Sequence, residues 1–295
     1  MSDPVRQHDP RGRPLAGARV PEKTAVHDHP RGLSRPVGTR SDLVRSGAVL
    51  LAMLLQIVAG ALGGSGALGE PVGEVARAYP TLLLPAGTAF LIWSLIYVAT
   101  FALAVRQVLP AQRGRDLHRA SGWPLAVAGL LNAGWIALFT QRQYLAAEVV
   151  IVALLAVLAL TWTRLSRIPA QGWADRLFVY TPVTIYTGWV LAAAVAGAAT
   201  TAAAEGLAPS GQVATVLAAL AVAATTAATL WVILRGQARA VAGFTLAVAW
   251  AIAWIAVATP AAAVSVVGGL AAAVLVGALL VRLARTARPA AAAAG

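Results

Sequence analysis

The chain has 295 residues, of which 59% are hydrophobic, and its mean hydropathy is +0.74. A soluble domain does not average so apolar a composition, so the sequence predicts an all-α integral membrane protein. The net charge of +12 does not indicate nucleic-acid binding, because the arginines flank the apolar runs, and the lack of cysteine excludes disulfides and Cys-based metal sites.

The N-terminal segment, residues 1–45, is polar and rich in Arg, Pro, Gly and His. This composition predicts a disordered basic tail. The segment is too long and too mixed for the n-region of a cleaved signal peptide, so we expect the first span to remain in the mature protein. His27 and His29 form an H-x-H pair, but without further ligand residues nearby they do not predict a metal site.

Eight apolar runs follow, each near the ~20 residues that a helix needs to cross a bilayer. All lysines and arginines except Arg77 and Arg142 fall on one side of the resulting topology, so the positive-inside rule predicts that both termini are cytoplasmic. We expect the membrane to be a bacterial inner membrane. Residues 285–295 form a short C-terminal tail. The predicted transmembrane bundle has spans near residues 46–66, 82–106, 122–140, 144–164, 177–200, 213–234, 239–258 and 262–281.

The second, third and fifth spans carry aromatic residues at helical spacing. Such faces pack in protein cores more often than they hold a ligand. The third span also carries an amide, which needs a partner because hydrocarbon offers none. We therefore expect these faces to point toward other helices or a ligand. Their members are Phe90, Trp93 and Tyr97, then Asn132, Trp135 and Phe139, then Pro182, Tyr186 and Trp189.

Glu148 is the acidic residue that lies inside a predicted span, about one turn from its outer end. An intramembrane carboxylate is a functional candidate. The alternative is that its side chain reaches out to the membrane surface, and the sequence weighs the two readings about equally.

Two of these patterns resemble the TspO/MBR family, the tryptophan-rich sensory proteins related to the mitochondrial translocator protein. P-x4-F-x2-W-x3-Y, from Pro85 to Tyr97, is similar to the second helix of that family. N-x2-W-x3-F, from Asn132 to Phe139, is similar to the third. The resemblance covers residues 46–205, a five-helix bundle, and leaves residues 206–284 as three added helices that we interpret as structural.

The resemblance implies an aromatic pocket that binds porphyrins, with protoporphyrin IX or haem as ligand and no required cofactor. It also implies a homodimer as one assembly. In the family, the loop after the first helix closes over the pocket and usually carries Trp, which this loop lacks. The implied ligand-binding residues are Pro85, Phe90, Trp93, Tyr97, Asn132, Trp135, Phe139, Glu148, Pro182, Tyr186 and Trp189.

The sequence offers an apolar cavity and few reactive groups. No predicted span contains His, Cys or Lys, which argues against an axial His for haem and against a Schiff base. We predict no catalytic residue and favour a sensor or regulator that binds a flat hydrophobic molecule. The open alternatives are a transporter of a small hydrophobic metabolite, for which Glu148 is the one buried titratable group, an enzyme that degrades porphyrin, and a membrane scaffold.

Overall fold

The computed structural model describes residues 38–235, 240–286 and 289–295, and every regular element in these ranges is a helix. The predicted all-α fold class is therefore confirmed. Most of the predicted N-terminal tail, including His27 and His29, lies outside the described residues.

Eight helical segments in the described part of the chain are long and apolar enough to cross a membrane, which confirms the predicted multi-span bundle. In chain order they are α1 (Arg40–Ser65), η1 with α3 (Gly87–Leu91, Ile92–Val108), α5 (Asp116–Thr140), α6 (Tyr144–Ser166), α7 with η2 and α8 (Trp173–Asp175, Arg176–Tyr180, Thr181–Ala204), α9 (Gly211–Leu234), α10 (Val241–Ala258) and α11 (Ala262–Arg285). Within the same described ranges, three short helices lie outside the spans: α2 (Val72–Ala78), α4 (Pro110–Arg113) and α12 (Pro289–Ala294).

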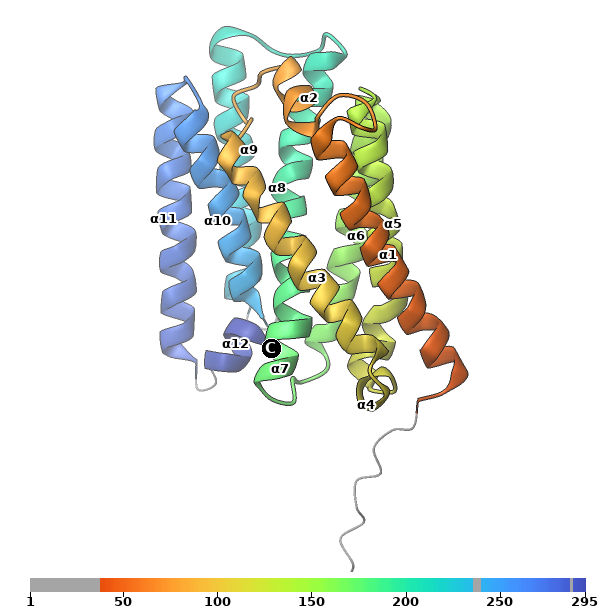
Figure 1. Cartoon of the computed structure of the whole chain (residues 1–295). Helices are drawn as coiled ribbons and strands as arrows, with labels where there is room; N and C mark the ends of the chain where they lie inside the picture. The colour runs from red at the N-terminus through yellow and green to blue at the C-terminus, as the bar shows by residue number, and fades with distance from the viewer. Residues whose placement is uncertain (1–37, 236–239, 287–288) are drawn as a thin grey trace, which may run out of the picture. The chain divides into compact units, whose positions relative to one another are not determined.

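The short helices mark the two ends of the bundle. Figure 1 shows α2 at one end, called the α2 end below, and α4, α7 and α12 at the other, called the α7 end. The first turn of α1 and the C-terminus both lie at the α7 end, as an even number of spans requires. Which side of the membrane this end faces remains a prediction.

The last three spans are packed into the same bundle as the first five, through close contact between α8 and α10. A Cβ added at Gly188 of α8 would lie 2.4 Å from the carbonyl oxygen of Phe244, and one added at Gly243 of α10 would lie 2.4 Å from Thr184 Oγ1. Small residues of this kind let helix backbones approach closely in lipid. As a result, buried Ala247 and Ala251 of α10 join the apolar cluster that holds the aromatic residues of α8.

The first span begins earlier than hydropathy indicates, at Arg40 instead of residue 46. Thr39 caps the helix: its hydroxyl accepts a hydrogen bond from Asp42 N (3.2 Å), and the Asp42 carboxylate accepts one from Thr39 N (3.0 Å). The polar residues that made this segment resemble the tail are therefore part of a helix, and Asp42 and Arg45 are buried.

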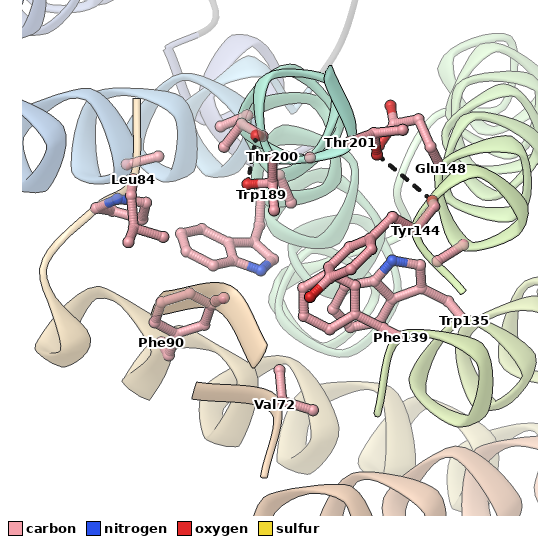
Figure 2. Close-up of a pocket in the computed structure, with 18 of the residues that line it drawn as sticks. Val72, Leu84, Phe90, Trp135, Phe139, Tyr144, Glu148, Trp189, Thr200 and Thr201 are labelled. Atoms are coloured by element: carbon pink, nitrogen blue, oxygen red, sulfur yellow. Dashed lines mark hydrogen bonds between the residues drawn. The ribbon is translucent and has the colours of Figure 1, made fainter. Parts of the chain in front are cut away.

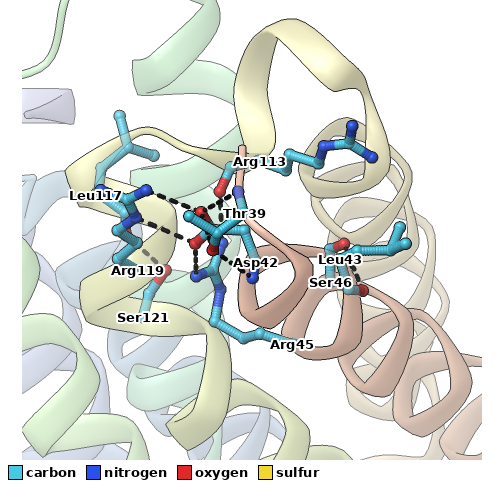
Figure 3. Close-up of polar contacts among 9 residues, drawn as sticks. All are labelled: Thr39, Asp42, Leu43, Arg45, Ser46, Arg113, Leu117, Arg119 and Ser121. Carbon is cyan, nitrogen blue, oxygen red and sulfur yellow. Dashed lines mark hydrogen bonds and ion pairs between the residues drawn. The ribbon is translucent and has the colours of Figure 1, made fainter. Parts of the chain in front are cut away.

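Two arginines, one from α1 and one from α5, meet the Asp42 carboxylate at the α7 end (Figure 3). Arg45 Nη1 donates to it at 2.5 Å, and Arg119 of α5 donates from Nε at 3.0 Å and from Nη2 at 2.7 Å. Arg45 also donates to the backbone carbonyl of Arg113, at 2.5 Å. This cluster ties α1 to α5 and to the turn before it.

A second carboxylate at this end is fully buried and also paired. Asp175 of α7 accepts from Arg106 Nη2 at 2.8 Å and from Arg115 Nη1 and Nη2 at 2.7 and 2.5 Å. It also accepts from the backbone N–H of Gln171, at 2.8 Å. His118, which the sequence placed between two spans, lies in α5 and is fully buried, because α5 begins at Asp116 instead of residue 122.

Candidate functional site

A cavity of about 60 Å³ opens among the helices near the α2 end (Figure 2). This volume is below the roughly 300–1,000 Å³ that is usual for small-molecule sites, so a ligand of that size requires the walls of the cavity to move apart. Most of the lining is aromatic or small and apolar. Of the residues predicted from the sequence, the lining includes Pro85, Phe90, Trp93, Trp135, Phe139, Glu148 and Trp189.

The aromatic rings form a connected wall beside this cavity. Trp93 stacks on Trp135, with ring centroids 6.0 Å apart and planes at 25°, and on Tyr97 at 5.5 Å and 28°. Trp135 in turn stacks on Phe139 at 5.1 Å and 18°. Trp189 of α8 meets Trp93 edge-on, with centroids 6.2 Å apart. These are the offset and T-shaped geometries that ring quadrupoles favour.

Three of the predicted site residues, Tyr97, Asn132 and Tyr186, lie next to the cavity in a polar layer. The centre of this layer is Gln56 of α1, a residue that the sequence analysis did not predict. The Tyr186 hydroxyl donates to Gln56 Oε1 at 3.2 Å, and Gln56 Nε2 donates to Thr100 Oγ1 at 3.0 Å. Asn132 Nδ2 lies 3.4 Å from Gln56 Oε1 and 3.5 Å from the Tyr97 hydroxyl. Gln56 supplies the partner that an intramembrane amide requires. The sequence did contain an indication of this role, because Gln56 is an amide inside an apolar run.

Pro182 does not line the cavity. It lies in the first turn of α8, near the α7 end, immediately after the π-helical turn η2. Proline has no backbone N–H to donate, and the irregular turn stands where the missing hydrogen bond would fall. The structure therefore places Pro182 among buried residues that shape the start of the helix.

The segment between α1 and α3 covers the cavity at the α2 end, although it carries no Trp. Val72 and Ala76 of α2 are part of the lining, and so is Leu84. The segment thus lies over the cavity with short apolar side chains, at the place where the loop of the TspO/MBR family was expected to cover a pocket.

A backbone contact and an ion pair fasten this covering segment to the turn between α5 and α6. Glu70 N donates to the Thr140 carbonyl at 3.1 Å, and Arg142 binds the Glu70 carboxylate through two hydrogen bonds of 2.7 Å. The Arg142 guanidinium lowers the pKa of Glu70. Gly69 has φ +148°, and a Cβ there would lie 2.5 Å from Thr140 O, so a side chain cannot enter this contact.

Helix α10 completes the cavity wall with Ala251 and Ile255. Two hydrogen bonds hold it against the segment that leads into α3: Trp250 Nε1 donates to the Ala89 carbonyl at 3.0 Å, and Ala86 N donates to the Trp254 carbonyl at 3.3 Å. The block interpreted from the sequence as structural thus includes one helix that lines the candidate site.

Glu148 of α6 is half-buried and lines the cavity. No hydrogen bond or ion pair joins its carboxylate to any residue in the described part of the chain. The carboxylate rests over Gly197 of α8, where an added Cβ would lie 2.5 Å from Glu148 Oε2. A glycine at this place makes room for the carboxylate between α6 and α8.

Comparison with known proteins finds a match that extends over the whole bundle. A family model described as TSPO-like protein matches residues 46–281, from α1 to α11. The match therefore continues beyond residues 46–205, where the sequence motifs lie, through the last three spans. No curated protein and no solved structure matches the chain.

Proposed function

Because the chain belongs to the TSPO-like family, we propose that it is a membrane sensor or regulator that binds a flat, mostly apolar ligand of the porphyrin class. The observation that carries the proposal is the wall of stacked aromatic rings beside a cavity of about 60 Å³. A planar ligand can extend such a stack, because aromatic faces contribute large buried area with little loss of side-chain entropy.

The rings are held in place before a ligand arrives, which supports binding instead of simple core packing. Trp93 is fixed between Trp135 and Tyr97, and Tyr97 reaches the polar layer through Asn132. The cavity beside these rings is not filled by any described side chain. Preorganised walls reduce the entropy that binding would otherwise cost.

The covering segment gives the proposed sensor a part that can respond. A ligand in the cavity would contact Val72, Ala76 and Leu84, whose segment is fastened by the exposed pair of Glu70 and Arg142. Exposed ion pairs contribute little to stability, so the segment can shift at low cost. Occupancy would thereby be communicated to the surface at the α2 end.

Transport of a small hydrophobic molecule is the alternative, and the unpaired Glu148 carboxylate favours it. A proton-coupled carrier needs a titratable group inside the membrane that is not already tied to a permanent partner. Flux of the ligand into proteoliposomes that depends on a proton gradient, and is lost in Glu148→Gln, would select transport over sensing.

The test is a titration of detergent-purified protein with protoporphyrin IX, followed by tryptophan fluorescence. We compare the wild type with Trp135→Leu and with Trp123→Leu, a matched change on the same helix at an exposed position away from the cavity. Saturable binding should persist in Trp123→Leu and weaken at least about tenfold in Trp135→Leu, which loses one stacking face.

A second variant keeps the test decisive if Trp135→Leu folds poorly. Ala196→Phe fills the cavity from α8 and leaves every aromatic residue of the wall in place. It should block binding while the thermal unfolding midpoint stays close to that of the wild type. Equal affinity in all four proteins would contradict the proposed pocket.

A further inference from the structure

Three polar groups on the cavity wall have no partner among the described residues: the Glu148 carboxylate, the Trp189 indole N–H and the Tyr144 hydroxyl. We propose that the ligand supplies all three partners. It would be a flat molecule that carries a protonated amine for Glu148 and a hydrogen-bond acceptor, such as a carbonyl, for Trp189 and Tyr144. This inference rests on the proposed function and narrows the ligand from flat molecules in general to those that are cationic at the Glu148 edge. A dicarboxylate such as protoporphyrin IX should then bind only with its propionates turned away from Glu148, and more weakly than a flat cation.

The two donors are deeply buried. Trp189 is 2% exposed and Tyr144 is 7% exposed, and neither Trp189 Nε1 nor the Tyr144 hydroxyl has a hydrogen-bond partner in the described part of the chain. In Figure 2 both groups point toward the middle of the pocket that they line. Buried donors are nearly always paired in native proteins, so two unpaired donors on one cavity indicate an acceptor that comes from outside the chain.

The carboxylate has no positive neighbour within the site. None of the residues that line the cavity is basic. Arg142, on the turn that leads into α6, is already engaged by Glu70 through two hydrogen bonds of 2.7 Å. A carboxylate at membrane depth calls for a counter-charge, and here the ligand is the component that can bring one.

The two threonine hydroxyls of the lining do not pair with Glu148. Thr200 donates its hydroxyl to the Ala196 carbonyl at 3.2 Å, and Thr201 donates to the Tyr144 carbonyl at 3.4 Å. Each hydroxyl has a single hydrogen to donate, so neither is left for the carboxylate. The space over Gly197 nevertheless holds the carboxylate at the cavity, where a charged nitrogen can approach it.

The pocket should therefore discriminate by charge among molecules of one shape. A cationic ligand gains the Glu148 contact, a neutral one leaves the carboxylate unpaired, and an anionic one is repelled. The expected order of affinity is cation over neutral molecule over anion. The acceptor contacts with Trp189 and Tyr144 add to all three equally.

Three anthraquinones share one flat ring system with two carbonyl acceptors and differ in charge. They are 2-(aminomethyl)anthraquinone, a cation at neutral pH, 2-methylanthraquinone, which is neutral, and anthraquinone-2-carboxylate, an anion. We would titrate each into the full-length protein in detergent and follow tryptophan quenching. The wild type should bind the cation at least about tenfold more tightly than the neutral molecule, and the anion most weakly.

Variants test separately the two parts of the inference, which are the charge contact with Glu148 and the hydrogen bond from Trp189. Glu148→Gln should remove the preference for the cation, so that the affinity for 2-(aminomethyl)anthraquinone falls to that for 2-methylanthraquinone. Glu205→Gln, a matched loss of one exposed carboxylate at the α2 end, should keep the preference. Trp189→Phe should weaken all three probes by the same factor and preserve their order, because it removes a donor and no charge.

Gly197→Ala tests the position of the carboxylate without changing its charge. The added methyl would displace the flexible end of the Glu148 side chain, so the fold should tolerate it while the preference for the cation falls. Equal affinities of the three probes in the wild type, or an unchanged preference in Glu148→Gln, would overturn the inference and leave the flat-ligand pocket standing. If neither the anthraquinones nor protoporphyrin IX bind, the proposed function fails with it.

Discussion

At the α7 end of the bundle, Asp42 and Asp175 each accept hydrogen bonds from two arginines, whereas Glu148 near the α2 end accepts none from the described residues. Buried charges that maintain a fold are paired, because the desolvation cost is otherwise too large. The α7 end is thus closed by contacts within the chain. The pocket, by contrast, leaves a charge and two donors for a molecule that the chain does not contain.

Asp175→Asn should produce the largest loss of stability, because it leaves two arginines near the buried site without their counter-charge. Removing one partner of a buried pair costs roughly 3–5 kcal/mol, and the low end applies here because Arg106 and Arg115 retain some contact with water. Equilibrium unfolding in mixed micelles measures the change. Asp116→Asn, an exposed change in the first turn of α5, is the control, and equal effects of the two would break the comparison.

Gln56→Leu should lower the free energy of unfolding by about 1–3 kcal/mol, since the hydroxyl of Tyr186 loses its acceptor in a buried layer. Gln107→Leu provides the matched case: Gln107 is fully buried, and its side chain has no hydrogen-bond partner among the described residues. That substitution should be neutral or stabilising. The same unfolding experiment applies, and a larger loss in Gln107→Leu than in Gln56→Leu would contradict the assignment of the polar layer.

Glu148→Gln should raise the free energy of unfolding, by up to about 1 kcal/mol, because it removes a half-buried charge that the chain does not pair. A gain in stability with a loss of ligand selectivity is the pattern expected of a residue retained for binding. Glu205→Gln, at an exposed position, should leave stability unchanged. A clear loss of stability in Glu148→Gln would place Glu148 with the structural carboxylates.

The pair of Glu70 and Arg142 should give the smallest effect, confined to the covering segment. Because Arg142 lowers the pKa of Glu70, the contribution of the pair is complete above the pKa of an unfolded glutamate and is lost as the pH falls below about 4. Amide protection factors in α2 should decrease in that range. Glu70→Gln should show the decreased protection at every pH, and a variant with normal, pH-independent protection would show that the pair does not fasten the segment.

Hydropathy predicted the eight spans because the bilayer imposes a length and an apolar composition on each one. It failed at the start of α1, where Asp42 and Arg45 count as polar although pairing across helices buries them. It also missed His118 at the start of α5, which is buried although neither ring nitrogen has a hydrogen-bond partner among the described residues. Pairing depends on which helices meet, and a sliding average along the chain does not contain that information.

The aromatic faces predicted much of the cavity lining, because spacing along a helix determines which residues share a face. These faces extend further along the helix axes than the cavity does. Tyr97, Asn132 and Tyr186 therefore lie in the polar layer next to the cavity. The sequence could not predict that α10 lines the cavity, because Ala251 and Ile255 are ordinary residues of an apolar helix. Their role follows from the packing of α10 on α8.

The stack of Trp93 on Trp135 has an optical consequence. Two indoles with centroids 6.0 Å apart and planes at 25° lie close enough for their strong transitions to couple, which should give a two-signed band in far-ultraviolet circular dichroism that is lost in Trp135→Leu. A ligand that inserts beside the pair would alter that band, even a ligand without colour of its own. Ligand occupancy can therefore be followed on the purified protein by circular dichroism, without a label.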